Sequence, residues 1–225
     1  MNMTILVTGG AGYTGSHVCI ELLKQGYEVI VVDNFLTSDV NRLYHIQEQA
    51  QDKIKFYAMD LGNKELVERI FRENEIEGII HFAGIKCTGE YTNKPIDYYY
   101  TNLTSTLVLC QVMAEHNVKK MLFSSSEGFY EDNGRNTTTF GSAKKMIERI
   151  LQEIYKVDAD WGIKIIRYLK EEDHVYTQND IHVNDMCKIY IDAFKAIKQG
   201  KFETYELEIN NKVISTHKIE DYKGY

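Results

Sequence analysis

The sequence predicts an α/β protein with a doubly wound parallel sheet. Short runs of apolar, β-branched residues alternate with longer stretches of helical periodicity from the N-terminus onward, which is the pattern of consecutive β–α–β units. A glycine-rich segment, residues 9–15, joins the first of these runs to the first helical stretch. The 225 residues suffice for one sheet with its covering helices but are few for two full domains.

The first half of the chain contains four predicted strands, each followed by a helix. Gly26 stops the first helix at the position favoured for a left-handed cap, Asn63 caps the third, and Pro95 begins the long fourth helix. The predicted strands are 4–8, 27–32, 54–58 and 78–82, and the predicted helices are 13–25, 39–51, 63–73 and 95–115. Helical spacing predicts that one face of the long helix carries Leu103, Leu107, Cys110 and Met113.

The second half continues the alternation and then loses it. Predicted strands at 120–123 and 163–168 flank a helix at 142–155, whose apolar face includes Met146. Six strands with intervening helices fit the Rossmann arrangement. Residues 170–180 are polar and typical of a loop, a helix is predicted at 184–198, and a last strand at 204–209. The periodicity of residues 210–225 is too weak for an assignment.

Charge and composition exclude several classes of function. Lys and Arg number 26 against 33 Asp and Glu, a net charge of −7, so the overall field disfavours nucleic acid and anionic membranes as partners. The longest apolar runs fall far short of the roughly 20 residues that span a bilayer. Four cysteines are scattered without a C-x-x-C pair, and the N-terminus lacks the pattern of a secretory signal. We therefore expect a cytoplasmic protein.

The glycine-rich segment is the strongest functional signal. Gly9, Gly12 and Gly15 lie between a predicted strand and a predicted helix, where glycines let the backbone approach a pyrophosphate at the positive end of the helix. Asp33 ends the second strand, 18 residues after Gly15, where a carboxylate accepts from the adenosine ribose and repels a 2′-phosphate. The pattern predicts a dinucleotide site that favours NAD over NADP. The alternative is a glycine-rich structural turn.

Several segments together resemble a known family. They are ILVTGGAGYTGSH, VVDNF, HFAGIK, the SSS after the fifth strand, and IHVNDM. These segments are similar to those of the extended short-chain dehydrogenase/reductases, and specifically of the UDP-glucose 4-epimerases. The resemblance is dense from residue 3 to about 120, patchy to 193 and faint afterwards. It implies a Rossmann fold, NAD as cofactor, and hydride abstraction and return at C4 of a UDP-hexose.

The resemblance also implies a set of cofactor-binding residues. Asp33 and Asn34 hold the adenosine ribose, Asp60 and Leu61 flank the adenine, and Asn102 lies beneath the cofactor. The pyrophosphate and nicotinamide side is lined by Phe82, Ala83, Gly84 and Lys86, and the remaining contacts come from Tyr13, Thr14, Ser124, Lys144 and Tyr168, besides the three glycines. Phe82 and Ala83 as core residues, and Asp60 as a surface turn residue, are the alternative interpretations.

No metal site is expected. His174 and His182, with Asp173 and Asp185, lack the i, i+4 pairing of a helical zinc site. The resemblance of the IHVNDM segment assigns His182 and Asp185 to structural hydrogen bonds.

The catalytic half departs from the family pattern. Ser126 fits the hydroxyl that binds the sugar oxygen, and Lys144 fits the lysine of the family's Y-x-x-x-K motif, but Phe140 occupies the tyrosine position. Loss of a positioned general base costs on the order of 10²–10⁴ in rate. Tyr130 is the nearest other phenol, but it precedes a loop. We expect an impaired epimerase; the alternative is a non-catalytic dinucleotide-binding protein, either a degenerate paralogue or an engineered minimal fold.

The substrate side is also shortened relative to the family. Leu169 and Lys170 replace the Phe and Asn of the family's R-Y-F-N, and Gln178 or Asn179 stands where an arginine grips the UDP phosphates. We expect residues 1–169 to form an NAD-binding Rossmann domain and 170–225 a residual substrate-side segment packed on it. The resemblance further implies a homodimer, paired through the helices near 95–115 and 142–156.

Overall fold

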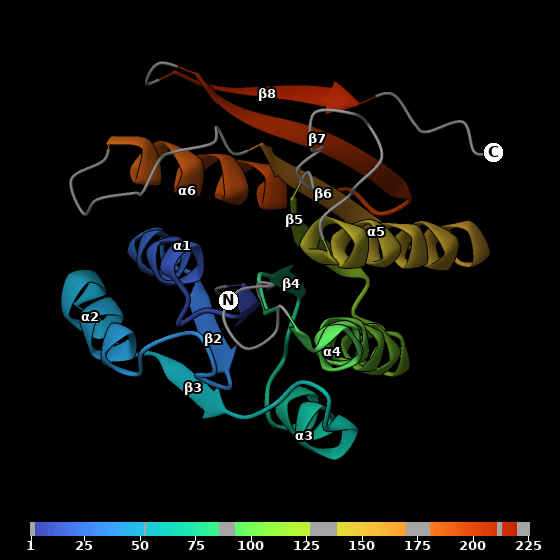
Figure 1. The fold of residues 1–225 in the computed structure, drawn as a ribbon. Coiled ribbons are helices and arrows are strands. Elements are labelled where there is room, and N and C mark those ends of the chain that lie inside the picture. The colour runs from blue at the N-terminus through green and yellow to red at the C-terminus, as the bar shows by residue number, and fades with distance from the viewer. Residues whose placement is uncertain are drawn as a thin grey trace. The chain divides into compact units, whose positions relative to one another are not determined.

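The fold is known from a computed structural model that describes residues 3–51, 53–85, 93–126, 139–169, 181–210 and 213–219. The chain separates into two compact units, Met1–Lys120 and Met121–Tyr225, which are described separately (Figure 1). The predicted division after residue 169 stays a prediction. Within the described residues, none of the helices has the length and apolarity needed to cross a membrane.

The first unit is a parallel sheet with helices between its strands. Its strands run in the order β3-β2-β1-β4, all parallel, which matches the first four positions of the six-strand Rossmann order. In chain order the elements are β1 (Thr4–Thr8), α1 (Tyr13–Lys24), β2 (Glu28–Asp33), α2 (Asn41–Ala50), β3 (Lys55–Ala58), α3 (Lys64–Glu73), β4 (Gly78–His81) and α4 (Pro95–Glu115). The register sets Thr8 beside Val32 and His81, so the ends of β1, β2 and β4 meet at one edge.

Burial on both faces explains the apolar strands of this unit. Every residue of β1 and β4 is buried, as expected for a parallel sheet that is covered on both sides. Helix α1 packs against α2, and α3 packs against α4. Figure 1 shows these two helix pairs on opposite sides of β2 and β3. The side chain of Asn63 accepts a hydrogen bond from the Leu66 amide, which confirms the predicted cap of α3.

The described residues of the second unit form four strands in the order β5-β6-β7-β8. Strands β6 and β7 are parallel, whereas β8 returns antiparallel to β7. The elements are β5 (Lys120–Ser126), α5 (Thr139–Val157), β6 (Gly162–Leu169), α6 (Ile181–Lys195), β7 (Lys201–Asn210) and β8 (Val213–Ile219). The largest fully buried side chains of this unit are Trp161, Tyr190, Phe123 and Phe194.

The predicted α/β fold is confirmed, with differences in detail. Strand β8 lies in the tail that received no assignment, and α6 begins three residues earlier than predicted. Leu107 and Met146, which lie on the predicted apolar faces of their helices, are 47% and 48% exposed. The inward face of α4 is instead partly polar, because Asn102, Ser105 and Thr106 are buried there.

Candidate functional site

The glycine segment folds into a tight loop between β1 and α1. Gly9 has a φ of 67°, and a Cβ placed on it would lie 2.7 Å from the Ala83 amide nitrogen. A Cβ on Gly15 would lie 2.4 Å from the carbonyl oxygen of Gly9, which also accepts from the Gly12 amide at 3.0 Å. Only glycine fits at positions 9 and 15. The backbone therefore runs close to the residues after β4.

The N-terminus of α1 has no side-chain cap. Gly12 occupies the N-cap without a side-chain hydrogen bond, and the first turn contains no acidic residue. Such a terminus presents backbone N–H groups and a partial positive charge. Thr14 lies in this first turn and is half-buried. The Tyr13 ring lies 5.2 Å from the ring of His17, one turn later on α1, and 5.7 Å from the Arg42 guanidinium on α2.

The Asp33 carboxylate is fixed against the glycine loop. Its Oδ2 accepts from the Ala11 amide at 3.0 Å, and its Oδ1 accepts from the Phe35 amide at 2.9 Å and the Ser38 hydroxyl at 2.7 Å. Asp33 is 9% exposed, and the following Asn34 is exposed, with its side chain accepting from the Leu36 amide. A carboxylate in this place receives hydroxyl donors and disfavours a second negative charge.

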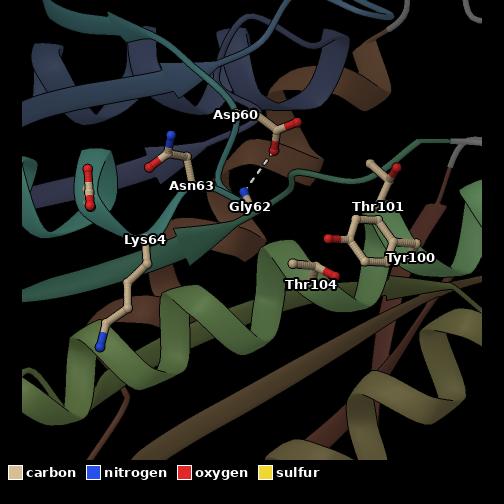
Figure 2. Close-up of a pocket in the computed structure, with 8 residues that line it drawn as sticks. Asp60, Gly62, Asn63, Lys64, Tyr100, Thr101 and Thr104 are labelled. Carbon is tan, nitrogen blue, oxygen red and sulfur yellow. Dashed lines mark hydrogen bonds between the residues drawn. The ribbon is translucent and has the colours of Figure 1, made fainter.

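A pocket of 610 Å³ opens between the turn after β3 and helix α4 (Figure 2). Asp60 lines this pocket and accepts from the Gly62 amide at 2.7 Å, while Leu61 is buried and does not line it. Lys64 reaches away to Glu115, 2.7 Å distant, and to Glu68. The residues that line the pocket are Asp60, Gly62, Asn63, Lys64, Glu65, Tyr100, Thr101 and Thr104.

The loop after β4 is held by hydrogen bonds from Asn102 on α4. Asn102 is 2% exposed, and its Oδ1 accepts from the Ile85 amide at 3.1 Å while its Nδ2 donates to the carbonyl oxygens of Ile85 and Tyr98. Phe82 and Ala83 are half-buried and Gly84 is exposed. The predicted contact Lys86 lies outside the described residues.

In the second unit, Lys144 is buried and held by the end of β5. Its Nζ donates to the Ser124 carbonyl oxygen at 3.0 Å and lies 4.7 Å from the centre of the Phe123 ring. The Ser124 hydroxyl bonds to the Tyr190 hydroxyl at 2.8 Å. Ser126 and Tyr168 are half-buried in β5 and β6. Phe140 lies in α5 one turn before Lys144, and its side chain is outside the described part.

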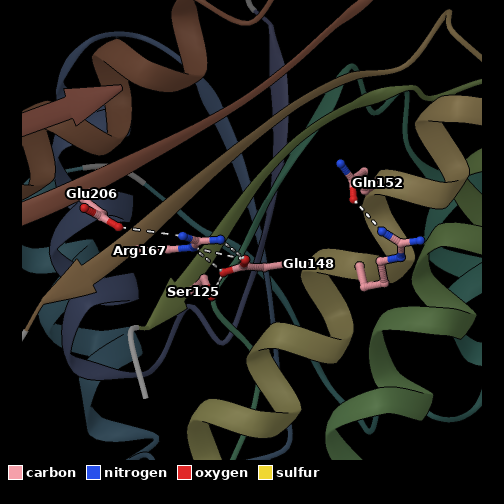
Figure 3. A network of polar contacts seen from close by, with 6 residues as sticks. Ser125, Glu148, Gln152, Arg167 and Glu206 are labelled. Atoms are coloured by element: carbon pink, nitrogen blue, oxygen red, sulfur yellow. Dashed lines mark hydrogen bonds and ion pairs between the residues drawn. The ribbon is translucent and has the colours of Figure 1, made fainter. Parts of the chain in front are cut away.

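An ion-pair network that the sequence interpretation missed lies beside these residues (Figure 3). Glu148, one turn after Lys144 on α5, accepts from the Ser125 hydroxyl at 2.5 Å and pairs with the Arg167 guanidinium at 2.7 Å. Arg167 also reaches Glu206 on β7 at 3.7 Å. The network ties β5, α5, β6 and β7 together. Glu148 and Arg167 are 19 residues apart, so local patterns do not connect them.

Among the described residues, no group of three His, Cys, Asp or Glu side chains is placed to hold a metal ion. Comparison with family models matches residues 5–170 to the "NAD dependent epimerase/dehydratase family". The chain belongs to this family.

Curated relatives of this epimerase/dehydratase family member are UDP-glucose 4-epimerases. The Bacillus subtilis (strain 168) protein is 44% identical over 74% of the chain, and the Neisseria meningitidis serogroup C protein is 41% identical over 73%. The chain spans about half the length of the curated relatives it matches, 52% in both cases. The crystal structure of the Bifidobacterium longum UDP-glucose 4-epimerase in complex with NAD⁺ and UDP has a TM-score of 0.80 and 32% identity, covering 95% of this chain and 80% of that one.

The predicted site residues of the family member fall into two groups. In the first unit the structure brings the glycine loop, Asp33 and the Phe82–Ala83 segment to one edge of the sheet. In the second it brings Ser124 and Lys144 into contact. The assignment of these residues to cofactor binding stays a prediction.

Replacement of Glu148 by Gln is expected to destabilise the protein. The change removes the charge that faces the Arg167 guanidinium, and breaking a partly buried pair of this kind costs about 2–3 kcal/mol. The matched control is Glu153→Gln, on the same helix but 48% exposed and bound to the exposed Arg149, where little change is expected. The measurement is the urea midpoint of unfolding, and equal midpoints for the two variants would contradict the role of the network.

Proposed function

We propose that this chain binds NAD and is of the UDP-glucose 4-epimerase type. The observation that carries the proposal is the Asp33 carboxylate held at the mouth of the glycine loop by the Ala11 amide. Phosphates at the α1 N-terminus and a ribose at Asp33 are the two contacts by which Rossmann proteins hold a dinucleotide. The negative charge of Asp33 favours NAD over NADP.

The residues present fit that cofactor. The missing side chains at Gly9 and Gly15 leave the backbone free to approach a pyrophosphate, and Asp33, Asn34 and Asp60 supply acceptors for ribose and adenine. Bound NAD would accept a hydride from C4 of a UDP-hexose and return it. In the second unit we assign Lys144 and Ser124 to the cofactor, and Ser126 to the sugar oxygen.

The proton-transfer step lacks its usual group. Phe140 stands where the family places the tyrosine base, one turn before Lys144, and phenylalanine has no proton to exchange. Tyr190 is the phenol that the described residues bring to Lys144 through Ser124, but burial raises the pKa of Tyr190 to about 12. It is therefore a poor base at neutral pH. We infer that epimerisation is impaired while cofactor binding is retained.

A non-catalytic dinucleotide-binding protein is the second candidate, and Phe140 is the observation that favours it. The UDP-hexose of the relatives, and a homodimer, are partners that the family suggests for this chain. Tyr100 and Leu107 on α4 are 70% and 47% exposed and supply an apolar surface for such pairing. Turnover of UDP-galactose separates the two candidates.

NAD is expected to stabilise the purified chain against heat, because a ligand that binds only the native state raises its stability, by about 2.7 kcal/mol at 100 times Kd.

Asp33→Asn is expected to weaken NAD binding about tenfold, through the loss of one charge-assisted hydrogen bond, and to reduce the preference for NAD over NADP. Asp39→Asn, at an exposed position in the loop that follows β2, is the control. Calorimetric titration measures both, and an Asp33 variant with unchanged NAD affinity and selectivity would refute the assignment.

Phe140→Tyr is expected to restore little or no epimerisation. The positions that grip the UDP phosphates in the family are replaced at Gln178 and Asn179, outside the described residues, so a new base alone does not complete the site. Conversion of UDP-galactose to UDP-glucose is followed for the unmodified chain and the variant. Measurable turnover by the variant would show that the site lacks only its base, and turnover by the unmodified chain would exclude the non-catalytic candidate.

A further inference from the structure

A fully buried histidine bridges two threonines beneath the loop after β4. The His81 Nδ1 lies 2.6 Å from the Thr8 hydroxyl at the end of β1, and its Nε2 lies 2.9 Å from the Thr106 hydroxyl on α4. All three residues have no exposed surface. Buried polar side chains of this kind are kept only where their hydrogen bonds are satisfied.

Two further hydrogen bonds extend this series beyond the imidazole. The Thr106 hydroxyl donates to the Asn102 carbonyl oxygen at 3.3 Å, and with the ring proton on Nε2 its oxygen accepts from His81. Nδ1 then accepts from the Thr8 hydroxyl, and the Thr8 oxygen accepts from the Ala83 amide at 3.4 Å. This assignment gives each of the two ring nitrogens one threonine hydroxyl as its partner.

Both ends of the series hold the same loop. One end is the Ala83 amide, and the other is Asn102, whose side chain bonds to the amide and the carbonyl oxygen of Ile85. The Ala83 amide nitrogen is also the atom that a Cβ on Gly9 would meet. The position of Ala83 thus decides how closely the loop after β4 borders the glycine loop.

We propose that His81 is a positioning residue for the nicotinamide half of the cofactor, an inference that rests on the proposed function. Strand β1 lies between β2 and β4. Asp33 at the end of β2 takes the adenosine ribose, and the pyrophosphate crosses the glycine loop above β1. The loop after β4, on the far side from Asp33, therefore meets the second half of the dinucleotide, and the Thr8–His81–Thr106 series holds it there.

The test compares NAD with AMP, which contains only the adenosine half. Thr8→Val and Thr106→Val each remove one hydroxyl without changing side-chain shape. Both are expected to weaken NAD binding about tenfold, equivalent to about 1.4 kcal/mol, while AMP affinity changes less than about twofold, the spread expected for a site that the change does not touch. Thr4→Val, at the opposite end of β1 and bonded to Glu28, is the matched control and is expected to change neither affinity.

Amide hydrogen exchange on the ligand-free protein tests the relay itself. Thr106 does not touch Ala83 directly, yet Thr106→Val is expected to speed exchange of the Ala83 amide several-fold, as Thr8→Val does, with Thr4→Val unchanged. If the Thr8 and Thr106 variants lose NAD and AMP affinity equally, or lose neither, the positioning role of His81 is refuted and the proposed function is not affected. Failure of the unmodified chain to bind NAD overturns the proposed function and this role with it. A loss of NAD affinity without a loss of AMP affinity, together with faster exchange of the Ala83 amide, supports both the proposed function and the positioning role of His81.

Discussion

The hydrogen bond from the Ala11 amide to the Asp33 carboxylate joins the two features on which the site depends. It requires a loop that turns sharply at Gly9, where φ is 67°, and that leaves no room for a side chain at Gly15. The Gly9 amide donates to the Val32 carbonyl oxygen at 2.8 Å, so the end of β2 is tied to the same loop. A bulkier residue at either glycine would separate the carboxylate from the helix N-terminus that it borders.

Buried polar contacts then set the loops around this centre. In the first unit the Thr8–His81–Thr106 series and Asn102 hold the residues after β4. In the second unit the Glu148–Arg167 pair holds the end of β5. Lys144 donates to the Ser124 carbonyl oxygen in the same part of that strand. Because an unsatisfied polar group in the core is costly, each network favours a single arrangement of its loop. The proposed cofactor site is built in this way, whereas the proposed proton-transfer site has Phe140 at its central position.

Much of the fold could be predicted because its signals are local. Apolar runs and helical spacing locate the elements of the first unit, and Asn63 and Gly26 mark helix ends. Strand β8 was missed because the periodicity of the tail is weak. The strand is defined by its pairing with β7, which is a tertiary contact. The exposure of Leu107 also depends on tertiary contacts. The side of α4 that is buried carries Asn102 and Thr106, which bond to Ile85 and His81. The networks at His81 and Glu148 join residues that are distant in sequence, and local patterns do not connect such residues.

The most direct measurement of the central claim is a crystal structure of the chain grown with NAD. We expect density along the glycine loop, with the pyrophosphate against the backbone at residues 9–15 and the ribose hydroxyls at the Asp33 carboxylate. An empty glycine loop at saturating NAD, or a dinucleotide bound away from Asp33, would contradict it.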